Sequence, residues 1–99
     1  PTDLTATTAS SALINLSWTD ASTNEEGFQI ERSLTTGSGF VLINTTAANS
    51  TTFADANLTA ATTYYYRIRA INAGGNSAYT AEASATTTAT IPLPPTSLI

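Results

Sequence analysis

The 99-residue chain has no cysteine, histidine or lysine, and only 10% of its residues are charged. Without these three residue types, the usual pairs of a nucleophile and a base cannot be built. Serine and threonine are abundant, but a hydroxyl with no base beside it is a poor nucleophile at neutral pH. The composition therefore predicts that the domain is not an enzyme, and no motif in it indicates a cofactor.

Positive charge is also scarce: the chain has three arginines and seven acidic residues, which give a net charge of −4. This sign is wrong for holding a phosphate backbone, so we expect no nucleic-acid partner. No apolar run approaches the roughly 20 residues that span a bilayer, so we expect no membrane insertion. The lack of cysteine leaves the redox compartment undetermined.

What is present favours β-structure, since threonine and serine supply roughly a third of the residues and threonine suits a pleated, half-exposed surface. Period-2 alternation recurs in short segments separated by turn residues, and no segment has a helical pattern. The pattern predicts an all-β domain with about seven strands. These lie near residues 4–9, 12–20, 28–31, from 40 through 42, around 53, 64–70 and 79–87.

The most informative segment begins at Leu58 and contains Tyr64 six positions later. Alternation then continues through Tyr66, Ile68 and Ala70. A β-sandwich needs such a pattern where the chain crosses from one sheet to the other and enters a central strand.

Four sequence markers together resemble the fibronectin type III family, in particular its bacterial extracellular branch. They are Leu16-Ser17-Trp18, residues 24–32, the pair of Leu58 and Tyr64, and residues 69–77. The resemblance implies an immunoglobulin-like β-sandwich in which a three-stranded sheet faces a four-stranded sheet, all antiparallel. It also implies structural roles in the core and in a tyrosine corner for Trp18, Leu58, Tyr64, Tyr66 and Ile68.

The loop over residues 20–26 collects oxygen-bearing side chains, so calcium is the best candidate for a metal. Its candidate ligands are Asp20, Asn24, Glu25 and Glu26. Their spacing matches no EF-hand loop. We favour the alternative in which these side chains bond to nearby backbone and polar groups, as turn residues commonly do.

The outer face of the predicted sheet carries a stripe of Tyr65, Arg67 and Arg69. Glu31 should face Arg67 or Arg69 across neighbouring strands and form an ion pair. As a functional site, the stripe could hold a sugar or a carboxylate. We favour a structural role, because single aromatic residues on outer sheet faces are common.

A glycine-rich loop over residues 72–77 adds Asn72 and Asn76 as candidate interaction residues, with Tyr79 just beyond it. Some members of the resembling family carry an integrin-binding tripeptide here, but this chain has no Arg-Gly-Asp sequence. The glycines are better explained by positive φ angles in a tight turn, and Tyr79 by half-burial at a strand end.

The C-terminal residues 89–99 contain three prolines and predict a semi-rigid linker after a sandwich over residues 1–88. Residues 95–98 repeat the pattern of residues 1–4 with one mismatch. This repeat favours the start of a following copy in a tandem array.

The sequence thus predicts a non-catalytic extracellular or cell-surface module that acts as a spacer in a tandem-repeat surface or secreted protein. Its expected partners are neighbouring copies or other domains of the parent chain. Residues 91–99 could also order against a neighbour and build a fibre, and strand edges without lysine favour such assembly. The alternative is a recognition module that binds a polysaccharide or a surface protein through its loops.

Overall fold

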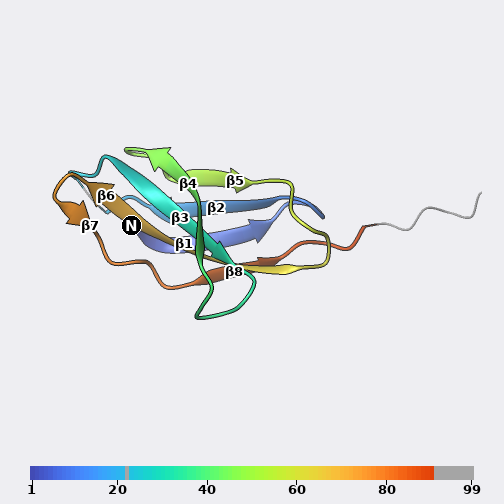
Figure 1. The fold of residues 1–99 in the computed structure, drawn as a ribbon. Coiled ribbons are helices and arrows are strands. Elements are labelled where there is room, and N and C mark those ends of the chain that lie inside the picture. The colour runs from blue at the N-terminus through green and yellow to red at the C-terminus, as the bar shows by residue number, and fades with distance from the viewer. Residues whose placement is uncertain (22, 91–99) are drawn as a thin grey trace, which may run out of the picture.

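The computed structural model describes residues 1–21 and 23–90, which form two antiparallel β-sheets packed face to face (Figure 1). One sheet has the strand order β1-β2-β5, and the other has the order β4-β3-β6, with both β7 and β8 paired to β6. This arrangement confirms the predicted all-β, immunoglobulin-like sandwich. The linker and restart predicted within residues 91–99 lie outside the described residues.

Eight strands build the two sheets, and their bounds are β1 Thr2–Thr8, β2 Ile14–Thr19, β3 Gly27–Ser33, β4 Val41–Ala47, β5 Thr52–Asp55, β6 Thr63–Asn72, β7 Gly75–Asn76 and β8 Ala83–Thr86. The second sheet has five strands instead of the expected four. The additional strand, β7, contains two residues, and it folds back on the end of β6.

The core lies between the sheets because alternate side chains of β2, β3 and β6 point inward. Along β2 the buried positions alternate strictly with exposed ones, as expected for a strand with one face in a core. The rings of Trp18 and Phe28 meet edge to face with centroids 5.6 Å apart. The fully buried members include Ile14, Phe28, Ile30, Tyr66 and Ile68. Leu58 packs against this core from its rim.

A corner before β6 is closed by side-chain hydroxyls. The Tyr64 hydroxyl accepts a hydrogen bond from the Thr59 N–H at 2.9 Å. The buried Thr87 hydroxyl accepts from the Thr62 N–H at 3.0 Å and donates to the Thr59 carbonyl at 2.6 Å. These bonds satisfy backbone groups that the turn leaves outside the sheet ladder.

The last strand begins later than predicted, at Ala83 instead of near Tyr79. Residues 77–80 still run beside β6, because the N–H groups of Ser77 and Thr80 donate to the carbonyls of Ala70 and Ile68, both at 2.9 Å. In return, the Ser77 and Thr80 hydroxyls accept from the N–H groups of the same two β6 residues. Hydroxyl oxygens thus replace the backbone carbonyls of a regular ladder, which alternation alone does not reveal.

Candidate functional site

The densest set of polar and aromatic contacts covers the outer face of the five-stranded sheet. Antiparallel register places Glu31 of β3 directly opposite Arg67 of β6, and Gln29 opposite Arg69. Each arginine bonds to its cross-strand neighbour. Arg67 Nε donates to Glu31 Oε1 at 2.8 Å, and Arg69 Nε donates to Gln29 Oε1 at 2.9 Å. Of the two partners predicted for Glu31, the structure selects Arg67, whose Nη2 lies 2.6 Å from Glu31 Oε1.

Aromatic rings enclose the Arg67 guanidinium. Its Cζ lies 4.4 Å from the centroid of the Phe40 ring and 3.9 Å from that of Tyr79. Arg69 stacks on the same tyrosine, with Cζ 4.7 Å from the centroid. All three distances are within the range of cation–π attraction. The Tyr79 hydroxyl donates to Glu31 Oε2 at 2.7 Å, so Glu31, Arg67 and Tyr79 form a closed set that we call the outer-face trio.

Burial on its own would raise the pKa of Glu31. Hydrogen bonds from Tyr79 and Arg67, together with the charges of Arg67 and Arg69, outweigh burial and lower that pKa below its ordinary value. The pKa of Tyr79 is raised, first by burial and then by its bond to the Glu31 carboxylate and by the charge of that carboxylate. The lowered pKa of Glu31 favours its ionised form, and the raised pKa of Tyr79 favours its protonated form. Around neutral pH, Tyr79 is therefore the hydrogen-bond donor and Glu31 the charged acceptor.

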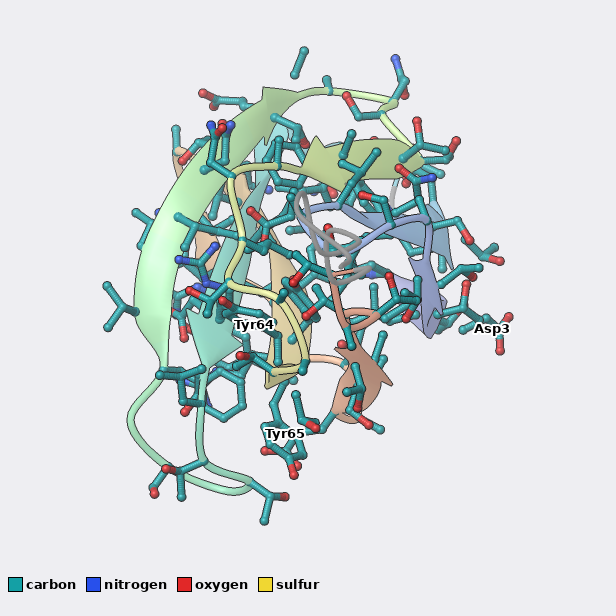
Figure 2. The ribbon with its side chains drawn as sticks, turned by 90° about the vertical axis from the view of Figure 1, so that its right-hand side faces the viewer. Asp3, Tyr64 and Tyr65 are labelled. Atoms are coloured by element: carbon teal, nitrogen blue, oxygen red, sulfur yellow. The ribbon has the colours of Figure 1, made fainter. Side chains whose placement is uncertain are left out.

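Tyr65 does not belong to this stack. It lies on β6 opposite Ser33 of β3 and Ser84 of β8. Figure 2 shows Tyr65 at the outer edge of the molecule, whereas Tyr64 lies among the strands. The aromatic partners of the two arginines are instead Phe40, which precedes β4, and Tyr79, which follows β6. Each charged group of the trio already has a partner, so these contacts suit a role in stabilising the sheet.

A second arginine–carboxylate–tyrosine set lies between the sheets, and we call it the inter-sheet trio. Arg32 Nη1 donates to both carboxylate oxygens of Asp55, at 3.0 and 2.9 Å. The fully buried Tyr66 donates its hydroxyl to Asp55 Oδ2 at 2.7 Å. Arg32 Cζ also lies 5.3 Å from the centroid of the Tyr64 ring. Asp55 is the last residue of β5, so this trio joins the three-stranded sheet to β3 and β6 of the other sheet.

Burial raises the pKa of Tyr66 strongly, and the hydrogen bond and charge of Asp55 raise it further. The phenol therefore stays protonated as a donor to Asp55. Sequence reasoning missed Arg32 and Asp55 as interacting residues. The available signal was that Arg32 continues the inward alternation of Phe28 and Ile30, where a charge needs a buried partner.

A polar pocket of about 460 Å³ opens at the end of the sandwich near β7. Its lining includes four residues predicted from the sequence, Asn24, Glu25, Asn72 and Asn76. Asn72 ties two loops together, since its Nδ2 donates to the Asn24 carbonyl at 3.3 Å and its Oδ1 accepts from the Gly74 N–H at 2.8 Å. Of the two loop glycines predicted to have positive φ angles, Gly75 has a φ of 137°, a conformation that favours glycine. The prediction is wrong for Gly74, whose φ is not positive.

Two of the four calcium candidates, Glu25 and Glu26, make side-chain contacts with loop backbone. Glu25 Oε1 accepts from the Asn49 N–H at 3.3 Å, and Glu26 Oε1 accepts from the Ala73 N–H at 2.9 Å. Among the described residues, no three acidic, histidine or cysteine side chains gather closely enough to hold a metal ion. Within the same residues, no helix has the length and apolar character needed to cross a bilayer.

Comparison with known proteins shows where this architecture recurs. A family model described as the fibronectin type III domain matches residues 1–86. A curated α-amylase of Niallia circulans is 39% identical over 92 residues, and the match spans 90% of this chain but 6% of that enzyme. A solved Fn3-like protein from Clostridium thermocellum has a TM-score of 0.75 and 30% identity, covering 85% of this chain and 86% of that one. A structure of titin domains has a TM-score of 0.77 at 24% identity over 89% of this chain and 31% of that one, a likeness in fold alone.

Proposed function

The chain belongs to the fibronectin type III family, and from this membership we propose that it is a non-catalytic module that spaces or links the domains of a secreted or surface protein. The observation that carries the proposal is the match to 6% of an α-amylase, because so small a share of a large enzyme is the size of one accessory module. The extracellular or cell-surface location expected from the sequence is part of this proposal.

The path of the chain through the sandwich suits a spacer. The N-terminus lies toward the β7 end of the long axis, and the chain leaves β8 toward the opposite end (Figure 1). A module entered at one end and left at the other adds its full length to a multidomain chain. The partners that we propose are therefore neighbouring copies or other domains of the parent chain.

The chemistry of the described residues supports a non-catalytic role. Two of the three arginines are ion-paired, Arg32 with Asp55 and Arg67 with Glu31. The two tyrosines with raised pKa values, Tyr66 and Tyr79, donate to those same carboxylates. Groups held in this way stabilise the sandwich and do not present a free acid or base to a substrate.

The spacer role can be tested by joining two copies of the 99-residue chain head to tail and measuring small-angle X-ray scattering. We expect the maximum dimension to come close to double that of one copy, with an unchanged melting temperature for the sandwich. A particle in which the two copies fold against each other would contradict the proposal. Hydrolysis of a soluble α-glucan by the isolated chain would contradict its non-catalytic part.

A second candidate function is recognition of a polysaccharide at the pocket near β7. Its amide side chains, contributed by Asn24, Asn72 and Asn76, suit hydrogen bonding to sugar hydroxyls. Affinity electrophoresis in gels that contain a soluble α-glucan tests this candidate. Retardation that is lost in Asn76→Ala would support it, and equal mobility with and without glycan would remove it.

A further inference from the structure

Exposed apolar side chains concentrate along one edge of the five-stranded sheet. The large hydrophobic side chains with the greatest exposure among the described residues are Leu34 at 66%, Val41 at 65% and Leu42 at 48%. Two of them lie on β4, and Leu34 lies in the loop that leads to it. A groove of about 490 Å³ opens at the same edge, and its lining includes Leu34 and Val41 together with Ile43 and Tyr64.

The other sheet edges carry features that hinder pairing with another chain. The pairing of β1 is interrupted by a register shift, and the edge carries Asp3, which projects outward in Figure 2. The strand β5 has four residues and ends at the ion-paired Asp55. On the remaining edge, β6 is already covered by β7 and β8, which have two and four residues. Charges, irregular pairing and short strands are the usual protection of an edge.

Strand β4 lacks most of this protection. It spans seven residues, Val41–Ala47, with neither a charged side chain nor a proline. One irregularity lies in β4 itself, because Ile30 pairs with Asn44 and Glu31 pairs with Leu42, which leaves Ile43 as an extra, bulged residue. Beyond this bulge, residues 44–47 pair in regular register with β3. It pairs only with β3 in the described structure, so its other side offers backbone groups to a further strand.

We propose that β4 pairs with β4 of a second copy of this chain in an antiparallel arrangement, which joins two five-stranded sheets edge to edge. The inference goes beyond the spacer role, because it concerns pairing at the β4 edge and not the connections to neighbouring domains along the chain. A two-fold pair is self-complementary, so one unprotected edge is sufficient for both partners.

The charges around β4 favour the antiparallel orientation. Near the Ala47 end, the Glu25 carboxylate accepts from the backbone of Asn49. Near the other end, Arg32 is the register partner of Val41, and Arg67 stacks on Phe40. Both arginines are ion-paired, so that end adds no excess negative charge. An antiparallel pair places Glu25 against the arginine-bearing end of the other copy, whereas a parallel pair would bring two Glu25 side chains together.

A fully overlapped antiparallel pair centred on Asn44 places Val41 of one copy opposite Ala47 of the other. It also covers Leu42 and extends the groove beside Leu34 toward the partner. The apolar area that is exposed in the single copy would then be removed from water, which is the driving force for the association.

The first experiment tests the pairing of the two β4 strands by disulfide cross-linking. Because the chain has no cysteine, a single introduced cysteine can form a disulfide only with its copy in another molecule. In Asn44→Cys, two-fold pairing would bring the two Cα atoms to roughly 4.5–5.5 Å, within the range of a disulfide. We expect this variant of the 99-residue chain to form covalent dimers under mild oxidation. The matched control is Thr52→Cys, an exposed position at the start of β5. Equal cross-linking of both variants would indicate random collision and would overturn the proposal.

The second experiment separates charge from apolar contact by sedimentation velocity. Val41→Glu and Val41→Lys remove the same side chain, but only the first places a carboxylate against Glu25 of the partner. We expect the dimer dissociation constant to rise at least about tenfold more in Val41→Glu than in Val41→Lys. Thr52→Glu should leave it unchanged. Wild-type chain that stays monomeric up to about 1 mM, the weak end of specific association, would overturn the proposal. Equal effects of the two Val41 variants would overturn the antiparallel orientation.

Discussion

The inter-sheet trio and the outer-face trio use the same three chemical groups in two different parts of the sandwich. In each, one carboxylate accepts hydrogen bonds from an arginine and from a tyrosine hydroxyl. The side-chain exposures are also close, at 32% for Arg32 and 7% for Asp55, against 33% for Arg67 and 12% for Glu31. Burial of the ion pair therefore does not distinguish them.

The difference lies in the tyrosine and in the elements that each trio connects. Tyr66 is fully buried in the core, whereas Tyr79 is half-buried on the surface. The inter-sheet trio joins two sheets whose described strands do not pair with each other. The outer-face trio connects β3, β6 and residues 77–80, which are already joined by backbone hydrogen bonds. The same chemistry should therefore contribute much more to stability in the first place than in the second.

The largest effect is expected from Asp55→Ala, which leaves the Tyr66 hydroxyl buried without its acceptor and Arg32 without its carboxylate. Breaking a buried pair on one side costs about 3–5 kcal/mol. Because Arg32 is 32% exposed and partly screened, we expect a loss near the lower end of that range. Urea unfolding followed by tryptophan fluorescence of Trp18 measures the change. A loss equal to that of Glu31→Ala would contradict the proposed difference between the trios.

Tyr66→Phe should give the next largest effect, because it removes one hydrogen bond to Asp55 and leaves Arg32 in place. A bond to a charged group contributes about 1.5–3 kcal/mol. The pKa of Tyr66 is raised by burial and by Asp55, so its contribution to stability is complete below the ordinary pKa of about 10. Above that pH the unfolded chain ionises first, and stability falls as pH rises.

Wild type should therefore lose stability between pH 9 and 11 more steeply than Tyr66→Phe, as measured by urea midpoints across this range. Tyr65→Phe is the matched control, since it removes a phenol that makes no hydrogen bond to a carboxylate among the described residues. Parallel curves for wild type and Tyr66→Phe would show that the phenol titrates alike in both states.

Several of these contacts could be predicted from the sequence, and the reason is locality. The alternation of Ile14, Leu16 and Trp18 within one strand correctly indicates a buried face. The short separation of Leu58 from Tyr64 indicates the corner, where the Tyr64 hydroxyl bonds to the Thr59 backbone. Such patterns involve residues that are close together in the sequence, so a single sequence is enough to recognise them.

The missed contacts join residues that are distant in sequence. Arg32 and Asp55 are 23 positions apart and meet across the gap between two sheets. Tyr79 reaches Glu31 over 48 positions, from a segment whose backbone is held by serine and threonine hydroxyls. The alternation within one strand does not indicate which charged side chain of the other sheet an inward-pointing charge will contact, because that depends on how the two sheets are stacked.

Glu31→Gln should have a smaller effect, since it weakens an ion pair between two strands that remain hydrogen-bonded. Such pairs contribute about 0.2–1 kcal/mol, and we expect a loss near the upper end because Glu31 is only 12% exposed and also accepts a hydrogen bond from Tyr79. The pKa of Glu31 is lowered in the folded state by Tyr79 and Arg67, against the effect of burial. Its contribution is therefore present above the ordinary pKa of about 4.3 and is lost as pH falls below it.

The stability difference between wild type and Glu31→Gln should accordingly be largest near pH 7 and shrink toward pH 3, as urea midpoints would show. Glu82→Gln is a positive control, and its stability difference from wild type should also shrink toward pH 3. The pKa of Glu82 is also lowered, by the Gly37 N–H and the Thr36 hydroxyl, but this residue lies outside the trio. A difference for Glu31→Gln that stays constant with pH would contradict a charged role for Glu31.

The smallest effect is expected from Arg69→Gln, which tests where the outer-face trio ends. Arg69 stacks on Tyr79 and bonds to the neutral Gln29, and it makes no salt bridge among the described residues. Removing it leaves the bond from Tyr79 to Glu31 and the contacts of Arg67 with Glu31, Phe40 and Tyr79. We therefore expect a loss of about 0.5 kcal/mol, typical of an exposed cation–π contact. In a double-mutant cycle with Glu31→Gln, the coupling energy should be near zero, whereas Arg67→Gln should couple to Glu31→Gln by most of the ion-pair energy. A coupling for Arg69 as large as that for Arg67 would extend the trio to a network of four charged and aromatic groups, and would make the whole outer face one cooperative unit.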